Sequence, residues 1–231
     1  MNIRTVHLCQ NVQSVVIRVG EEIIMTVLYS YIVAFDSGFA PNPFNGFCTL
    51  ATCKPQIREN AKINDWIIGT GSNRRGVKRG GFLVYAMRVQ ESLTYADYWN
   101  DPRFLPKRPN LNGSYRMACG DNIYCPDPSG NCWIQLNSYH SHNDGKPHQK
   151  HIDKDTSINR VLISNDFVYF GAEGPKIPDK SCYKLVCKNR GYRKIGYQTA
   201  IADFESWLHS LKKKGYQGRP FDMLQEVKKR K

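Results

Sequence analysis

Hydrophobic positions in this chain gather in short runs, and glycine, proline and asparagine residues separate them. The run over residues 27–35 is rich in β-branched and aromatic side chains, which favours a β-strand. Its hydrophobicity is almost continuous, so we expect both faces of this strand to be buried. The same reasoning predicts strands over residues 65–71, 82–89 and 133–136, and a strand pair bent at Asn165 over residues 160–170.

Helical periodicity is clearest near the end of the chain. Residues 199–214 are predicted to form an amphipathic helix, because apolar side chains recur at spacings of three and four, namely Ile201, Phe204, Trp207, Leu208 and Leu211. Shorter helices are predicted over residues 91–99 and after Pro55, which suits a first helical turn. Several short strands with one strong helix indicate α+β: a single domain with a small curved or barrel-like, mainly antiparallel sheet and a C-terminal amphipathic helix.

The two ends of the chain differ from its centre. We interpret residues 1–24 as a translated leader or a mis-assigned start, because a Glu-Glu pair precedes Met25 where a purine-rich ribosome-binding sequence would be encoded. The alternative is an ordinary N-terminal strand followed by a hairpin. We expect the folded domain over residues 25–223 and a basic tail over residues 224–231.

The charge balance points to a polyanionic partner. Lysine and arginine number 33 against 20 aspartates and glutamates, a net charge of +13. Such an excess favours binding to DNA, RNA or a nucleotide. Part of it lies in the C-terminal lysines, which form either a solvated tail or a source of sequence-independent phosphate affinity.

Eight cysteines occur without a secretory signal and without an apolar span of membrane length. We therefore expect a cytoplasmic protein with no membrane partner, whose cysteines are thiols or metal ligands rather than disulfides. The glycine-rich segment over residues 69–76 matches neither a Walker loop nor a Rossmann fingerprint, and we expect no cofactor.

Functional residue types are densest between residues 35 and 71, in a Gly/Pro loop between two predicted strands. Lys54 and Arg58 are four apart and could grip a phosphate from one helical face. Cys53 beside Lys54 is a candidate nucleophile, with burial of Cys48 and Cys53 as the alternative. The predicted ligand-binding residues are Asp36, Phe39, Asn42, Thr49, Lys54, Arg58, Asp65 and Trp66.

A second group of chemically active residues lies over residues 119–151. Four of the six histidines fall between His140 and His151, after three cysteines. Zinc binds such side chains, but the spacings match no standard ligand box, so we predict no metal and keep as candidate ligands Cys119, Cys125, Cys132 and His140. The alternatives are a polar active-site loop that supplies an acid or base, and a solvated loop. The predicted catalytic residues are Cys53, Lys54, His140 and His142.

No pair of nucleophile and base can be identified from the sequence alone, because the partners of a catalytic cysteine need not be close in sequence. Aromatic side chains in the loops could stack a flipped or single-stranded base, or simply belong to the core.

Several motifs in fixed order resemble the nucleotide modification associated domain family, type two. They are FDSGFAPNPF, CTLATCKPQIR, DWIIGTGS, LVYAMRV, ISNDFVYFG and GRPFDM. The resemblance runs from Met25 to about residue 223 and implies a link to DNA base hypermodification in bacteria and phages. It carries over to Asp36, Gly38, Phe39, Pro41, Asn42, Pro43, Cys53, Lys54, Pro55, Arg58, Asp65 and Trp66. The strand-rich pattern is also loosely similar to PUA and EVE modules, which is an analogy of fold only.

Three functions follow from these observations. The first is a nucleic-acid or nucleotide-binding protein that recognises a modified base through the Gly/Pro loop and Lys/Arg phosphate contacts. The second is an enzyme acting on a modified base or nucleotide with Cys, Lys and His residues. The third is an accessory subunit that docks on a base-modifying enzyme.

Overall fold

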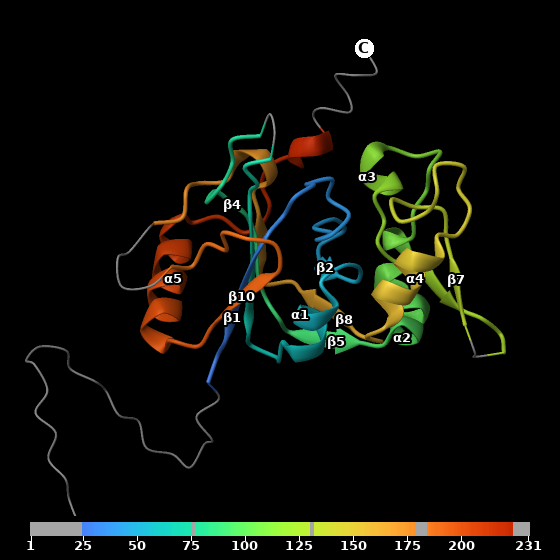
Figure 1. Ribbon diagram of the computed structural model, residues 1–231, viewed down its shortest axis with the longest axis horizontal. Coiled ribbons are helices and arrows are strands. Elements are labelled where there is room, and N and C mark those ends of the chain that lie inside the picture. Colours follow the sequence, from blue (N-terminus) through green and yellow to red (C-terminus); the bar gives the residue numbers. More distant parts are fainter. Residues whose placement is uncertain (1–24, 75–76, 130–131, 179–183, 224–231) are drawn as a thin grey trace, which may run out of the picture.

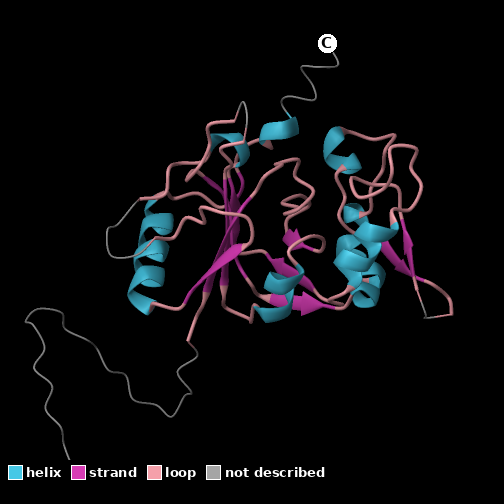
Figure 2. Cartoon of the chain, in the orientation of Figure 1, coloured by secondary structure: helices cyan, strands magenta, loops and turns pink. Residues whose placement is uncertain are grey.

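The computed structural model describes residues 25–74, 77–129, 132–178 and 184–223. The proposed leader and the basic tail lie outside the described residues. Figures 1 and 2 show helices on the outer sides of a central set of strands. The fold is therefore α+β, with mostly antiparallel sheets.

Six strands form the larger sheet. Their order is β10 (Tyr192–Ile195), β1 (Leu28–Ile32), β3 (Trp66–Thr70), β4 (Leu83–Arg88), β9 (Phe167–Tyr169) and β11 (Gly215–Tyr216). The pairs β1–β3 and β9–β11 are parallel, and the other neighbours are antiparallel. The sheet is open, with β10 and β11 at its edges. Of the curved or barrel-like shapes expected from the short strands, the barrel is therefore wrong.

The described strands also form two smaller sheets. An antiparallel sheet of three strands has the order β2 (Cys48–Leu50), β8 (Val161–Ser164) and β5 (Glu91–Leu93). Strands β6 (Tyr124–Pro126) and β7 (Trp133–Gln135) form a separate antiparallel pair. The helices are α1 (Pro55–Asn60), α2 (Tyr95–Asn100), α3 (Tyr115–Ala118), α4 (Gln149–Thr156) and α5 (Gln198–Ser210), with 3-10 turns η1 (Pro102–Lys107) and η2 (Gly171–Glu173).

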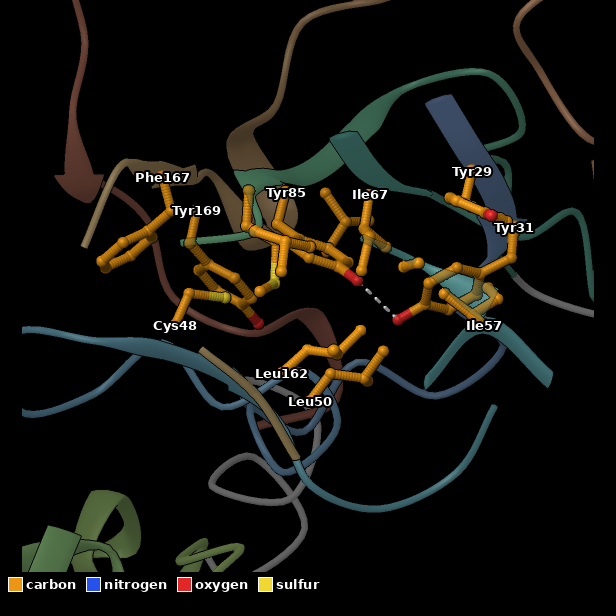
Figure 3. Packing of buried hydrophobic residues seen from close by; sticks show 14 of the residues in the cluster. Tyr29, Tyr31, Cys48, Leu50, Ile57, Ile67, Tyr85, Leu162, Phe167 and Tyr169 are labelled. Carbon is orange, nitrogen blue, oxygen red and sulfur yellow. Dashed lines mark hydrogen bonds between the residues drawn. The ribbon is translucent and has the colours of Figure 1, made fainter. Parts of the chain in front are cut away.

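Successive side chains of a strand point to opposite faces of its sheet, which explains how these layers stack. Tyr29 and Tyr31 of β1 pack on one side of the larger sheet against Leu50 of β2 and Ile57 of α1. Figure 3 shows this interface, including the hydrogen bond of 3.0 Å between the hydroxyls of Tyr31 and Tyr85. Burial on both faces of β1, expected from its continuous hydrophobicity, is confirmed.

The opposite face of the larger sheet is covered by α5, which lies at the left in Figure 1. Leu28, Trp66 and Ile68 pack there against Ile201 and Phe204 of the helix. The three-stranded sheet, called the smaller sheet below, has a second face that points away from the larger sheet. This face packs against α2, η1 and α4 through a third hydrophobic cluster. The order of layers is thus α5, larger sheet, smaller sheet, and a helical layer with the β6–β7 pair.

Two expected elements differ from the structure. The strands around Asn165 exist, but β8 belongs to the smaller sheet and β9 to the larger one, so the bend carries the chain between sheets. The helix expected over residues 91–99 begins only at Tyr95, because residues 91–93 pair with β8. Thr94 caps the helix by accepting a hydrogen bond of 3.1 Å from the amide of Asp97.

The parallel pairing of β1 with β3 positions the candidate site. Parallel neighbours need a crossover connection, and here it runs through β2 in the smaller sheet and returns through α1. Cys53 lies on this return, between β2 and α1, where both sheets and α4 meet.

Candidate active site

Cys53 lies in a short turn with an uncommon backbone conformation. Its φ is 61° and that of Lys54 is 42°, both in the left-handed region that L residues with side chains rarely adopt. Such conformations cost of order 1–3 kcal/mol each and persist where surrounding contacts enforce them. Pro55 then starts α1, as its position in the sequence predicts.

Arg58 supplies those contacts. Its side chain is fully buried. Its Nε donates to the carbonyl of Cys53 at 2.9 Å, and its Nη1 donates to the carbonyls of Ile158 and Arg160 at 2.7 Å. Nη2 donates to the carbonyl of Asp155. The guanidinium of Arg58, predicted to contact a phosphate, thus joins the Cys53 turn to the end of α4.

The thiol of Cys53 faces a histidine and a carboxylate. Sγ lies 3.5 Å from Nε2 of His140, which comes from the loop after β7. Nδ1 of the same ring lies 2.6 Å from Oδ2 of Asp155 on α4. The carboxylate of Asp155 also accepts from the amide of Cys53 at 2.8 Å and from the hydroxyl of Tyr124 at 2.7 Å. The thiol, the imidazole and the carboxylate are thus joined in one row, an arrangement that also occurs where a base activates a nucleophile.

The charges within this row support one another. Burial disfavours the imidazolium of His140, but hydrogen bonds and charges from Asp155 and Cys53 outweigh it and raise its pKa to about 9. Burial likewise disfavours the Asp155 carboxylate, yet the hydrogen bond and charge of His140 hold the pKa of that carboxyl below its usual value. The two shifts agree in describing an ion pair of imidazolium and carboxylate.

A cavity of about 410 Å³ opens in front of the thiol. Cys53, His140, Lys54 and Phe39 line it, together with Tyr139. The ring centroid of Phe39 lies 4.8 Å from that of His140 and 5.7 Å from that of Tyr139. The cavity thus presents a thiol, an imidazole and aromatic surfaces to one occupant, and Lys54 adds a positive charge.

The structure brings together some of the sequence-predicted site residues and separates others. Cys53, Lys54, His140 and Phe39 share the cavity. His142 lies beyond it, with its ring stacked on that of His148 at 4.2 Å.

Three of the predicted ligand-binding residues have structural partners instead. Asp36 is buried, and its carboxylate accepts from the hydroxyl of Tyr169 and from the amide of Phe221 at 2.9 Å. Asp65 accepts from the backbone amides of Val27 and Lys62, and Trp66 donates to Glu205 on α5 at 2.7 Å. These contacts dock the C-terminal segment, close a turn and attach α5.

Asn42 and Thr49 belong to a buried polar network. Lys107 donates to Oδ1 of Asn42 at 2.7 Å, and Thr49 donates to Asp121 at 2.6 Å. Asn42 in turn donates to the carbonyl of Cys119 at 2.8 Å. The network fixes the Gly/Pro loop from behind, and both side chains are buried away from the cavity.

Potential metal ligands also converge at this site. Across the described residues, the one set of three or more whose donor atoms lie within 4.8 Å of one another is Cys53, His140 and Asp155. Cys119, Cys125 and Cys132, the candidate ligands from the sequence, are not part of it. The same three groups could therefore bind a metal or act as nucleophile, base and carboxylate.

Two residues of the site were missed by sequence reasoning. Asp155 and Tyr124 have no distinguishing motif. The available signal for Asp155 is its place on α4, where the buried positions are Ile152 and Asp155, three residues apart. An acidic residue on the buried face of a helix needs a specific partner, which makes it a candidate functional residue.

The site is thus a hydrogen-bonded row of a thiol, an imidazole and a carboxylate, from Cys53, His140 and Asp155. The chain matches the family model described as nucleotide modification associated domain 2 over residues 25–227, and it belongs to that family. It is therefore associated with nucleotide modification. Neither curated proteins nor solved structures gave a match. None of the helices in the described part of the chain is long and apolar enough to span a membrane.

Proposed function

We propose that this protein is an enzyme of nucleotide modification that uses Cys53 as its nucleophile. His140 is the general acid and base, and Asp155 is the residue that positions the imidazole. The observation that carries the proposal is the continuous row from Sγ of Cys53 to the buried carboxylate of Asp155. Family membership supplies the nucleotide context.

The row suits transfer or hydrolysis of an acyl group on a nucleotide. Asp155 accepts a hydrogen bond from Nδ1–H and stabilises the imidazolium, so Nε2, which faces the thiol, holds the proton that ionisation of the thiol releases. Sγ then bonds to the acyl carbon, and the bond from that carbon to the leaving group breaks. The leaving group takes the proton from Nε2. Water or a second nucleophile then attacks the thioester carbon and gives its proton to Nε2. The C–S bond breaks, and Sγ leaves as the thiolate beside the His140 imidazolium.

Lys54 fits a supporting role at the same cavity. Its ammonium lies 4.5 Å from the ring centroid of Tyr31 and donates to the carbonyl of Gly191 at 3.4 Å. Burial lowers the pKa of Lys54. Its charge is available to a substrate phosphate or to a developing oxyanion.

Recognition of a modified base without chemistry is the second candidate. It is favoured by the ring of Tyr139, which lines the cavity and is 44% exposed, so that a base can stack on it. This function needs no reactive thiol, so a measurement of Cys53 chemistry separates it from the first.

The test uses p-nitrophenyl acetate as an activated acyl donor. We expect a rapid release of nitrophenolate equivalent to one per chain, with acetylation of the peptide that contains Cys53. Cys53→Ser and His140→Gln abolish this phase, whereas Cys132→Ser, at an exposed thiol, leaves it unchanged. Acetylation spread evenly over the cysteines, or one tightly bound metal ion per chain that blocks the reaction, would overturn the nucleophile assignment.

A further inference from the structure

A large basic groove adjoins the Cys53 cavity. Its volume is about 1260 Å³, above the roughly 300–1,000 Å³ of typical small-molecule sites. Within the described residues, no aspartate or glutamate lines it. The lining does contain seven basic side chains: Lys54, Arg74, Lys154, Lys176, Lys184, Lys188 and Arg190.

Most of this charge has no carboxylate partner. Among the seven, and counting only residues that the structure describes, Arg74 alone forms an ion pair, with Asp222. Like charges gathered along a groove raise the local concentration of anions and are unfavourable without them. One nucleotide carries too few phosphate charges to neutralise the set, whereas a chain of phosphodiesters can follow it.

The groove and the cavity are continuous. Lys54, Lys154 and Phe35 line both. The ring of Phe35 is 70% exposed and lies 4.1 Å from the guanidinium of Arg74. An exposed aromatic ring beside cations is the arrangement on which bases of single strands stack. An occupant of the groove would therefore pass over Phe35 on its way to Cys53.

We infer that the groove binds a single strand of nucleic acid. Its phosphates lie along Lys176, Lys184 and Lys188, and one base stacks on Phe35. A neighbouring nucleotide then enters the Cys53 cavity, a step that rests on the proposed enzyme function. The substrate is accordingly a nucleotide within a polynucleotide chain rather than a free nucleotide.

The test measures fluorescence anisotropy of a labelled single-stranded DNA 12-mer across a NaCl series. The groove variant is Lys176→Gln/Lys184→Gln/Lys188→Gln. The matched control removes three exposed lysines elsewhere: Lys62→Gln/Lys213→Gln/Lys214→Gln. We expect at least a tenfold loss of affinity for the groove variant and a salt slope smaller by about 2, from about 0.7 per lost phosphate contact. The control changes affinity less than threefold.

Equal losses in both variants would overturn the inference, because they would mean that affinity follows net charge alone. Tighter binding of a duplex, or full competition by micromolar mononucleotide, would overturn it as well. Failure of the groove proposal can be distinguished from failure of the enzyme proposal. Cys53→Ser keeps strand affinity if the groove is correct, and the groove variant keeps acetylation of Cys53 by p-nitrophenyl acetate if the nucleophile is correct.

Discussion

Replacing Asp155 with asparagine tests the electrostatic core of the site. The substitution keeps the size of the side chain but removes the negative charge 2.6 Å from Nδ1 of His140. In the native protein the pKa of His140 is raised from 6.5 to about 9 despite burial. A shift of that size corresponds to roughly 3 kcal/mol in favour of the imidazolium. Without the carboxylate, Cys53 alone opposes the effect of burial, and His140 becomes a weaker base.

The expected consequence is slower reaction of Cys53. If about half of the lost free energy is felt in the transition state, the rate falls roughly 15-fold at pH 7. The assay is alkylation by iodoacetamide, followed by mass spectrometry of the peptide that contains Cys53. Exposed Cys132 in the same sample provides a reference thiol. Asp153→Asn, an exposed change on the same helix, is the matched control and leaves the rate within twofold.

A folded Asp155→Asn protein that alkylates at the native rate would refute this reasoning. Thermal unfolding establishes whether the variant is folded, because the carboxylate also accepts from Cys53 and Tyr124. His140→Gln provides a second route to the same answer, since it removes the base and leaves Asp155 in place. New alkylation of the buried Cys48 and Cys119 would indicate general unfolding instead.

Three further outcomes are expected. Arg58→Met lowers the unfolding free energy by about 3–5 kcal/mol in denaturant titrations, because four backbone carbonyls lose their donor, and Arg58→Lys, which cannot fork, recovers little of it. Tyr124→Phe removes a hydrogen bond to a charged group and costs about 1.5–3 kcal/mol in the same assay, with a measurable drop in Cys53 acetylation. Burial raises the pKa of Asp36 from 3.8 to about 6, so folding favours its neutral form. The contribution of Asp36 to stability is therefore fully present below pH 4 and falls by roughly 3 kcal/mol as pH rises through 6, which pH-dependent unfolding measures as the difference from Asp36→Asn.

Most strands of the larger sheet could be predicted from the sequence, because they contain long apolar runs. Strands β3 and β4 fall inside the predicted ranges, since each has five or six consecutive buried or nearly buried residues. Strand β2 was missed because three residues, Cys48–Leu50, are too few to show a period. Residues 91–93 were assigned to a helix because their strand partner, β8, lies about 70 residues further on, and local propensity cannot report such pairing.

Only part of the site could be predicted from the sequence, because its residues are far apart along the chain. Residue type alone makes Cys53 and His140 candidates. Their contact cannot be predicted from local sequence, because 87 residues separate them. Arg58 shows the opposite error: a cation four residues after Lys54 suggests a shared surface, yet its side chain is fully buried. The four-residue spacing of Lys54 and Arg58 predicts that the two side chains share one helical face. It does not predict whether that face is buried, because burial depends on tertiary packing.

The crossover explains why the chemistry lies where it does. A parallel pair such as β1 and β3 obliges the chain to leave the larger sheet and return. Here the return must pass from β2 into α1 within four residues, which forces Cys53 and Lys54 into left-handed conformations. That strain is sustained by contacts from Arg58 to the end of α4, the helix that also carries Asp155. Cys53 and Asp155 are therefore held by one buried cation, so a change that loosens the turn should also loosen the row of Cys53, His140 and Asp155.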